Sequence, residues 1–150
     1  MEKVVIGDAT LFCGDAIKIM PSLRADVLIT DPVWPNCPAD LLAGGDDPYA
    51  LWMQAMAAMP RSVERLVAVL RCDSDPRFLV DVPHRLRFFR TALLPYVMPH
   101  YIGRVLGGDE IAYCYGDPVA PARHPRSCPG GAARKSAAER TSVLAGAVTF

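Results

Sequence analysis

The sequence predicts an α/β domain with a mostly parallel sheet and an antiparallel pair of strands at one edge. Apolar runs of strand length at 27–30 and 65–71 alternate with segments in which apolar residues recur at helical spacing. Such alternation is typical of parallel strands joined by crossovers. Two later strand-like segments, 88–96 and 110–115, have no long helical segment between them, which indicates antiparallel pairing.

The first part of the chain predicts a strand–helix–strand unit. Residues 9–13 form a short strand, and residues 4–6 before it form a separate edge piece. Residues 16–23 place apolar side chains at helical spacing, with Asp15 at the N-cap or just before it. The next strand is 27–30. A crossover of this kind implies that the two strands are parallel neighbours.

The middle of the chain predicts a loop, a helix and a buried strand. Residues 35–47 contain prolines, glycines and acids and are a loop, after which Asp47-Pro48 is an N-cap followed by a proline at the first helical position. The helix runs to about Met59. The strand at 65–71 is almost continuously apolar, as in strands covered on both faces. Residues 73–76 open a turn or a short helix.

The end of the chain changes in composition. After the strand at 110–115 and Gly116, residues 117–140 are rich in Pro, Ala, Gly, Arg and Ser and lack periodicity. The apolar piece at 143–150 is too short to be a unit of its own. The sequence therefore predicts an α/β domain over 1–117 and a disordered tail over 118–150.

Composition and charge fit a globular protein and exclude few functions. The chain has 150 residues, of which 51% are hydrophobic and 21% charged, enough for one core. Residues 1–117 carry 11 Lys/Arg against 15 Asp/Glu, and residues 118–150 carry five against one. Because the net charge is zero, binding to nucleic acid would depend on a local basic surface.

Cysteine spacing and hydropathy bear on metals and membranes. The five cysteines include no Cys-x-x-Cys pair, so neither a zinc site nor a disulfide framework is expected. Charged residues interrupt the N-terminal apolar run, and no stretch of about 18 apolar residues is present. We therefore expect a cytoplasmic protein with reduced thiols, no metal and no membrane span.

A possible chemical site lies where the strand at 27–30 ends in Asp31-Pro32-Val33-Trp34. In open α/β sheets, ligands bind beyond the carboxyl ends of strands. An enzyme that alkylates an exocyclic amine of a nucleobase must accept the amine hydrogens, because the nitrogen lone pair is otherwise delocalised into the ring. The Asp31 carboxylate and the Pro32 carbonyl can accept them, and the prolines hold that carbonyl outward. Trp34 offers a flat face to an extruded base.

Three segments carry a resemblance to a known family. They are Gly14-Asp15, the run from Asp26 to Trp34, and Gly108-Asp-Glu-Ile-Ala-Tyr-Cys-Tyr-Gly116. Together they resemble the amino-group DNA methyltransferases, which act on adenine N6 or cytosine N4 and carry the signature Asp/Asn/Ser-Pro-Pro-Tyr/Phe/Trp. The resemblance covers residues 9–117. It implies a Rossmann-like methyltransferase sheet, S-adenosylmethionine as cofactor and DNA as partner, with adenine N6 preferred as the target.

The resemblance also assigns roles to single residues. Asp31, Pro32 and Trp34 would be catalytic, and Val33 and Trp34 would contact the substrate base. Asp15 would contact the adenosine part of the cofactor. From the sequence alone, Asp15 is equally well explained as a helix cap.

Two departures from the family pattern bear on activity. Val33 stands where the family usually has a second proline, which leaves the Pro32 carbonyl in place but makes the loop less rigid. The Phe-x-Gly-x-Gly strand–turn, which holds the methionine end of the cofactor, is absent, and Ala145-Gly146-Ala147 only partly resembles it. We therefore expect an incomplete methyltransferase sheet. A missing C-terminal half or a partner chain would then supply the cofactor motif.

Alternatives stay open at this point. An Asp-Pro at a strand end is often only a turn. The chain could be a truncated, inactive remnant that binds DNA or a partner, and a related motif could methylate RNA or protein glutamine. No Ser-His-Asp set, P-loop or His-Glu-x-x-His motif supports a hydrolase or a nucleotide-phosphate enzyme.

Overall fold

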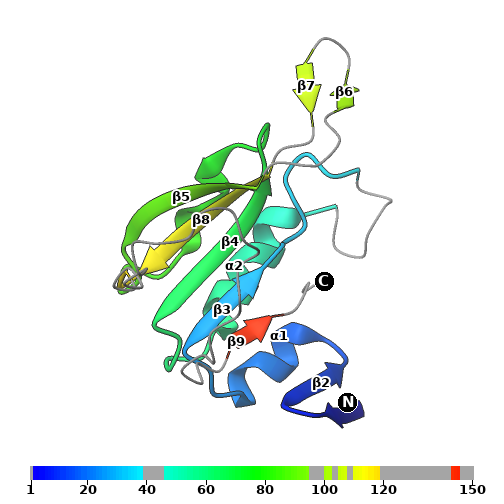
Figure 1. Cartoon of the computed structure of the whole chain (residues 1–150), viewed down its shortest axis with the longest axis vertical. Coiled ribbons are helices and arrows are strands. Elements are labelled where there is room, and N and C mark those ends of the chain that lie inside the picture. The colour runs from blue at the N-terminus through cyan, green and yellow to red at the C-terminus, as the bar shows by residue number, and fades with distance from the viewer. Residues whose placement is uncertain are drawn as a thin grey trace, which may run out of the picture.

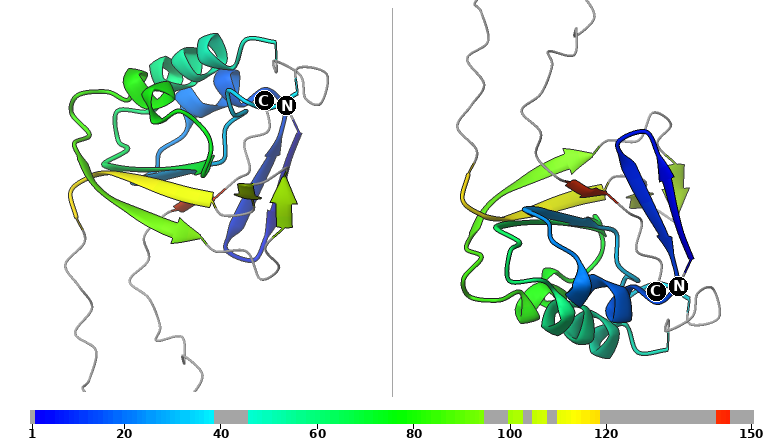
Figure 2. Two further views of the ribbon diagram at one scale, coloured as in Figure 1. Left: turned by 90° about the horizontal axis from the view of Figure 1, so that it is seen from above. Right: turned by 90° about the horizontal axis from the view of Figure 1, so that it is seen from below.

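The protein is an α/β structure built on one mixed sheet. The computed structural model describes residues 2–38, 46–94, 100–102, 105–107, 110–118 and 143–145. The strands are β1 (Glu2–Ile6), β2 (Ala9–Cys13), β3 (Val27–Thr30), β4 (Arg65–Arg71), β5 (Phe88–Leu94), β6 (His100–Ile102), β7 (Val105–Gly107), β8 (Glu110–Gly116) and β9 (Val143–Ala145). The helical segments are α1 (Ala16–Ile19), α2 (Pro48–Ala58) and the 3-10 helices η1 (Met20–Ser22) and η2 (Pro76–Asp81). Figures 1 and 2 show the helical segments together on one side of the main sheet.

The main sheet has five strands in the order β5-β8-β4-β3-β9. β3 pairs in parallel with β4, from Val27 opposite Arg65 to Thr30 opposite Ala68. β8 pairs antiparallel with both β4 and β5. The predicted antiparallel pairing near the edge is therefore confirmed, and so is a mixed α/β architecture. As far as the structure describes this sheet, β8 alone runs against the other four strands.

Strand β4 is the centre of the sheet, and its two faces differ. Leu66, Ala68 and Leu70 are completely buried on the face toward α2. The residues between them, Val67 and Val69, are only partly buried. Because side chains alternate between the faces of a strand, the helices cover one face fully. The expectation of a strand buried on both faces was too strong.

Helix α2 begins and ends where the sequence predicts. The Asp47 carboxylate accepts a hydrogen bond from the Ala50 backbone N–H at 2.9 Å, and Pro48 occupies the first turn. The helix ends before Met59, whose backbone is already extended. An N-cap of this type satisfies a backbone donor that the helix itself leaves unpaired.

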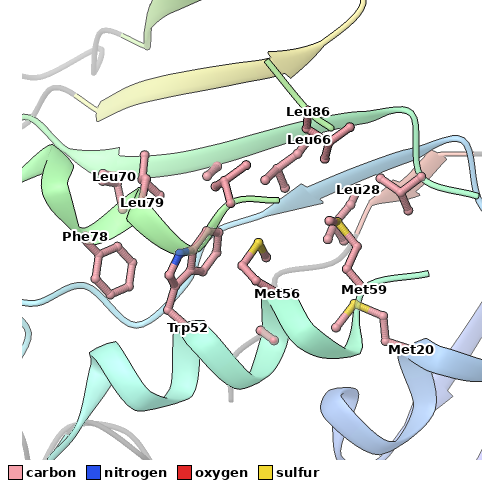
Figure 3. Close-up of a cluster of buried hydrophobic side chains, with 14 residues drawn as sticks. Met20, Leu28, Trp52, Met56, Met59, Leu66, Leu70, Phe78, Leu79 and Leu86 are labelled. Carbon is pink, nitrogen blue, oxygen red and sulfur yellow. The ribbon is translucent and has the colours of Figure 1, made fainter. Parts of the chain in front are cut away.

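The hydrophobic core lies between α2, η2 and the sheet (Figure 3). Trp52 and Met56 point from α2 toward Leu66 and Leu70 of β4. The rings of Trp52 and Phe78 have centroids 5.4 Å apart and are tilted against each other. Because α2 packs against both β4 and η2, the core fixes the position of the carboxyl end of β4 relative to the helices.

The predicted parallel pairing of residues 9–13 with 27–30 is wrong. β2 instead pairs antiparallel with β1 in a separate hairpin, with Ile6 opposite Ala9. Gly7 has a φ of 59°, and a glycine in that conformation at the first position of a two-residue turn favours a tight hairpin. The hairpin pairs one edge of β2 with β1, and β2 does not join the main sheet. α1 is also shorter than predicted, because Pro21 turns the chain into η1.

The predicted disordered tail contains a strand. Within 118–150, the structure describes Pro118 and the strand β9, which pairs in parallel with Val27, Leu28 and Ile29 of β3. β9 therefore satisfies the backbone edge of β3 that β2 leaves open. The rest of the predicted tail lies outside the described residues, as do residues 95–96 of the strand expected at 88–96 and residues 39–45 of the expected loop.

Gly116, at the end of β8, provides a test of this strand arrangement. A Cβ on Gly116 would lie 2.1 Å from the backbone oxygen of Glu64, and the residue has a φ of +102°. We expect Gly116→Ala to lower the free energy of unfolding by about 2–4 kcal/mol, because steric overlap and backbone strain add. Urea denaturation measures this free energy.

Gly7→Ala is the matched control. Gly7 also has a positive φ, of +59°, but nothing lies within 4 Å of an added Cβ. Only the backbone conformation is penalised there, at about 1 kcal/mol. A loss for Gly116→Ala that is no larger than the loss for Gly7→Ala would contradict the close approach of β8 to Glu64.

Candidate functional site

The candidate site lies at the edge of the sheet where β3 and β4 both end. Asp31 follows Thr30, the last residue of β3, and Cys72 follows Arg71, the last residue of β4. Because the two strands are parallel, their carboxyl ends meet at the same edge. β8 runs the other way, so it brings its first residue, Glu110, to this edge opposite Arg71.

Asp31 is exposed, yet its surroundings disfavour its charged form. Burial of its carboxyl by neighbouring atoms raises the pKa of Asp31 above the usual value, and the negative charge of Glu110 raises it further. The indole N–H of Trp34, which also bonds to the Val69 backbone oxygen, acts in the opposite direction and lowers the pKa. An acid held in unfavourable surroundings at a strand end is typical of functional sites. The role of Glu110 was not visible in the sequence, because it depends on the reversed direction of β8.

Pro32 and Val33 are both buried, and Val33 is only 4% exposed. The Val33 side chain therefore packs inward at the position of the family's second proline. Any contact of Val33 with a substrate would have to come from its backbone. Packing of these two side chains anchors the turn that carries Asp31.

Trp34 is partly buried and held by three contacts. Its indole Nε1–H donates a hydrogen bond to the Val69 backbone oxygen at 3.2 Å. Its own backbone oxygen accepts from the Cys37 N–H at 2.9 Å, which closes a turn. The guanidinium carbon of Arg71 lies 5.8 Å from the centroid of the indole ring, a distance typical of cation–π contacts. Trp34 is thus fixed to β4 and is less free than its sequence context suggests.

A polar network joins the loop after β3 to the turn after β4. Asn36 Nδ2 donates to Asp73 Oδ1, and Ser74 Oγ donates to Asn36 Oδ1, each at 2.9 Å. Arg71 Nη2 donates to Asp73 Oδ2, also at 2.9 Å. The sequence analysis missed this network. A signal was present, since an amide beside the tetrapeptide from Asp31 to Trp34 and an acid two residues after the next strand come to one edge in a parallel pair.

Asp15, the residue assigned to the cofactor, caps helix α1. Its Oδ1 accepts from the Ile17 backbone N–H at 3.0 Å, and its Oδ2 lies 3.0 Å from Lys18 Nζ. The hydrogen bond from Lys18 lowers the pKa of Asp15 most, so its carboxyl group stays charged. None of these interactions reaches the loop from Asp31 to Trp34. Asp31, Pro32, Val33 and Trp34 therefore form one group, and Asp15 is not part of its bonded network.

The contacts of Asp15 give no support for its role as a ligand of S-adenosylmethionine. Both carboxylate oxygens of Asp15 already have partners, and β2, which precedes it, stands outside the main sheet.

No group of three or more His, Cys, Asp or Glu side chains suited to a metal ion occurs in the described parts of the chain. No helix in the described parts of the chain is long and apolar enough to cross a membrane.

Comparison with known proteins adds no assignment. No protein-family model matches the chain, and no curated protein matches it. A function can therefore be inferred only from the geometry of the site and from the sequence motif.

The raised pKa of Asp31 predicts a pH-dependent cost to stability. Since the folded state binds this proton more tightly than the unfolded state, stability falls as the pH rises from the unfolded value of about 3.9 through the folded value. Asp31→Asn removes the charge. We expect the variant to be at least as stable as the wild type at pH 7, with the difference shrinking as the pH approaches 4.

Urea midpoints at pH 7 and pH 4 measure this effect. Asp81→Asn is a suitable control, because Asp81 is an exposed acid at the end of η2. A variant Asp31→Asn that is less stable than the wild type at pH 7 would contradict the account.

Proposed function

We propose that the edge from Asp31 to Trp34 binds the exocyclic amine of a nucleobase in DNA for methyl transfer. Adenine N6 is the preferred target and cytosine N4 the second. The observation that carries the proposal is the position of Asp31. Its exposed carboxyl lies beyond the carboxyl end of β3, on a turn anchored by buried Pro32 and Val33, with the Trp34 ring beside it.

The chemistry follows from what the amine requires. A nucleobase amine is a poor nucleophile until its two hydrogens are accepted by oxygen atoms that keep the nitrogen lone pair out of the ring. Asp31 and the Pro32 carbonyl are suited to this pair of hydrogen bonds. A carboxylate accepts such bonds more strongly than a neutral group does. Transfer should therefore require ionised Asp31 and be lost as the pH falls through its raised pKa.

Trp34 is suited to hold the plane of the base. Stacking of a base on an aromatic ring contributes about 1–3 kcal/mol in single-strand binders. The hydrogen bond from Nε1 to Val69 prevents the indole from turning, so a stacked base would keep its amine near Asp31. Bases treated in this way must leave the duplex, as in other enzymes that act on a base.

S-adenosylmethionine is proposed as the methyl donor because of the family resemblance alone. When bound, it would supply an electrophilic methyl group. The mixed sheet is compatible with a Rossmann-like methyltransferase sheet. Residues outside the described ranges, or a second chain, would have to form the cofactor site.

Replacement of Asp31 provides the direct test. We expect Asp31→Ala to reduce transfer of labelled methyl groups from S-adenosylmethionine to DNA by at least about 100-fold, the usual scale for loss of one preorganised group. Asp81→Ala, away from the site, should transfer as the wild type does. Wild-type rates in Asp31→Ala would refute the assignment of this edge as the reaction site.

A second candidate is a base-binding module without catalysis, and the engagement of Asp15 favours it. Titration calorimetry of the full chain with S-adenosylmethionine separates the two. For an enzyme we expect saturable heat at cofactor concentrations below about 1 mM, within the usual range for substrates. Absence of heat, together with binding to DNA, would establish the module.

A further inference from the structure

The Trp34 ring has two kinds of neighbours. Trp34 packs against the hydrophobic core. Leu70 of β4 is buried in that core, and because side chains alternate along the strand, Arg71 points to the opposite face of the sheet. The guanidinium of Arg71 lies over the indole ring, 5.8 Å from its centroid.

Arg71 is also tied in place. Its Nη2 donates to Asp73 Oδ2 at 2.9 Å, and Asp73 is in turn held by Asn36 at 2.9 Å. The Arg71 side chain is 29% exposed, which is less than the 88% of Arg77 in a comparable pair with Asp75. The guanidinium is thus held over the ring by its ion pair with Asp73.

We propose that Arg71 is a placeholder, which covers the face of Trp34 on which the nucleobase stacks and which the base displaces. The inference rests on the proposed function, because it concerns the same site. A guanidinium is planar and stacks on aromatic rings much as a base does. Trp34 also packs against the core, so part of its surface is unavailable to a base, and the cation and the base compete for the ring surface that Arg71 covers.

This competition raises the binding energy that any base needs. A base displaces Arg71 only if its own interactions exceed the Arg71 contact. Adenosine gains both stacking on Trp34 and hydrogen bonds to Asp31 and Pro32. Purine riboside, which has the same rings but no exocyclic amine, gains stacking alone. Arg71 therefore lowers the affinity for both nucleosides by the same factor, and the preference for adenosine comes from Asp31 and Pro32.

The test uses Trp34 itself as the reporter. The chain has two tryptophans, and Trp52 is 1% exposed, so quenching of fluorescence by acrylamide reports on Trp34. We expect Arg71→Ala to increase this quenching. We also expect it to tighten binding of adenosine and of purine riboside, followed by Trp34 fluorescence, by about 2–5-fold, because a cation–π contact of ordinary strength no longer has to be broken.

Two further variants refine the expected result. Asp73→Asn keeps an oxygen for Asn36 but removes the charge that holds Arg71, so its affinity for adenosine should lie between those of the wild type and Arg71→Ala. Arg71→Lys keeps a cation near the ring and should stay close to the wild type. Arg77→Ala is the matched control: Arg77 pairs with Asp75 at the same two-residue spacing and should leave both readouts unchanged.

The outcomes separate this inference from the proposed function. Unchanged or weaker adenosine binding by folded Arg71→Ala, with a normal circular dichroism spectrum, would overturn the placeholder even if methyl transfer still depends on Asp31. Failure of every variant to bind either nucleoside would overturn a base as the ligand of Trp34. Increased acrylamide quenching in Arg71→Ala would then show that Arg71 covers the Trp34 ring but is not displaced by a base.

Discussion

The parallel pairing of β3 with β4 is the constraint on which the candidate site depends. The register from Val27 opposite Arg65 to Thr30 opposite Ala68 brings both strands to an end at one edge. Leu66, Ala68 and Leu70 secure β4 against α2 through complete burial. With β4 fixed, the Val69 carbonyl has a defined position for the indole of Trp34, and Arg71 and Asp73 have defined positions beside it. A shift of one residue between β3 and β4 would separate all of these partners.

The sequence predicts those parts of the fold whose determinants are local. Asp47-Pro48 caps and starts α2, and Asp75-Pro76 does the same for η2, because each cap needs only a carboxylate two or three residues from a free backbone N–H. The position of β2 could not be inferred from its apolar residues. The same strand could pair antiparallel with β1 in a hairpin or in parallel with β3 after a crossover. Here the turn at Gly7 and Asp8 decides the competition. Parallel pairing of β9 with β3 depends on contacts distant in sequence, which no local pattern encodes.

The candidate site likewise contains residues that are adjacent in the sequence and residues that only the fold brings together. Asp31, Pro32, Val33 and Trp34 are contiguous, so their association could be predicted from one motif. Glu110, Arg71 and Asp73 reach the site only because β8 is reversed and β4 ends level with the loop. Burial of its carboxyl raises the pKa of Asp31 and the charge of Glu110 raises it further, so the motif identifies Asp31 but not its surroundings.

The outer strand β5 has a consequence for how the protein behaves in solution. In the part of the sheet that the structure describes, β5 is the last strand, and Phe88 and Leu93 on it are 55% and 72% exposed. An exposed, apolar edge strand is a template for pairing with another chain. The register shift between Phe88 and Arg90 interrupts that template, and the charge of Arg90 opposes a second copy. Pairing of β5 with a second copy of the chain is thus opposed by one irregularity in the backbone and by one arginine.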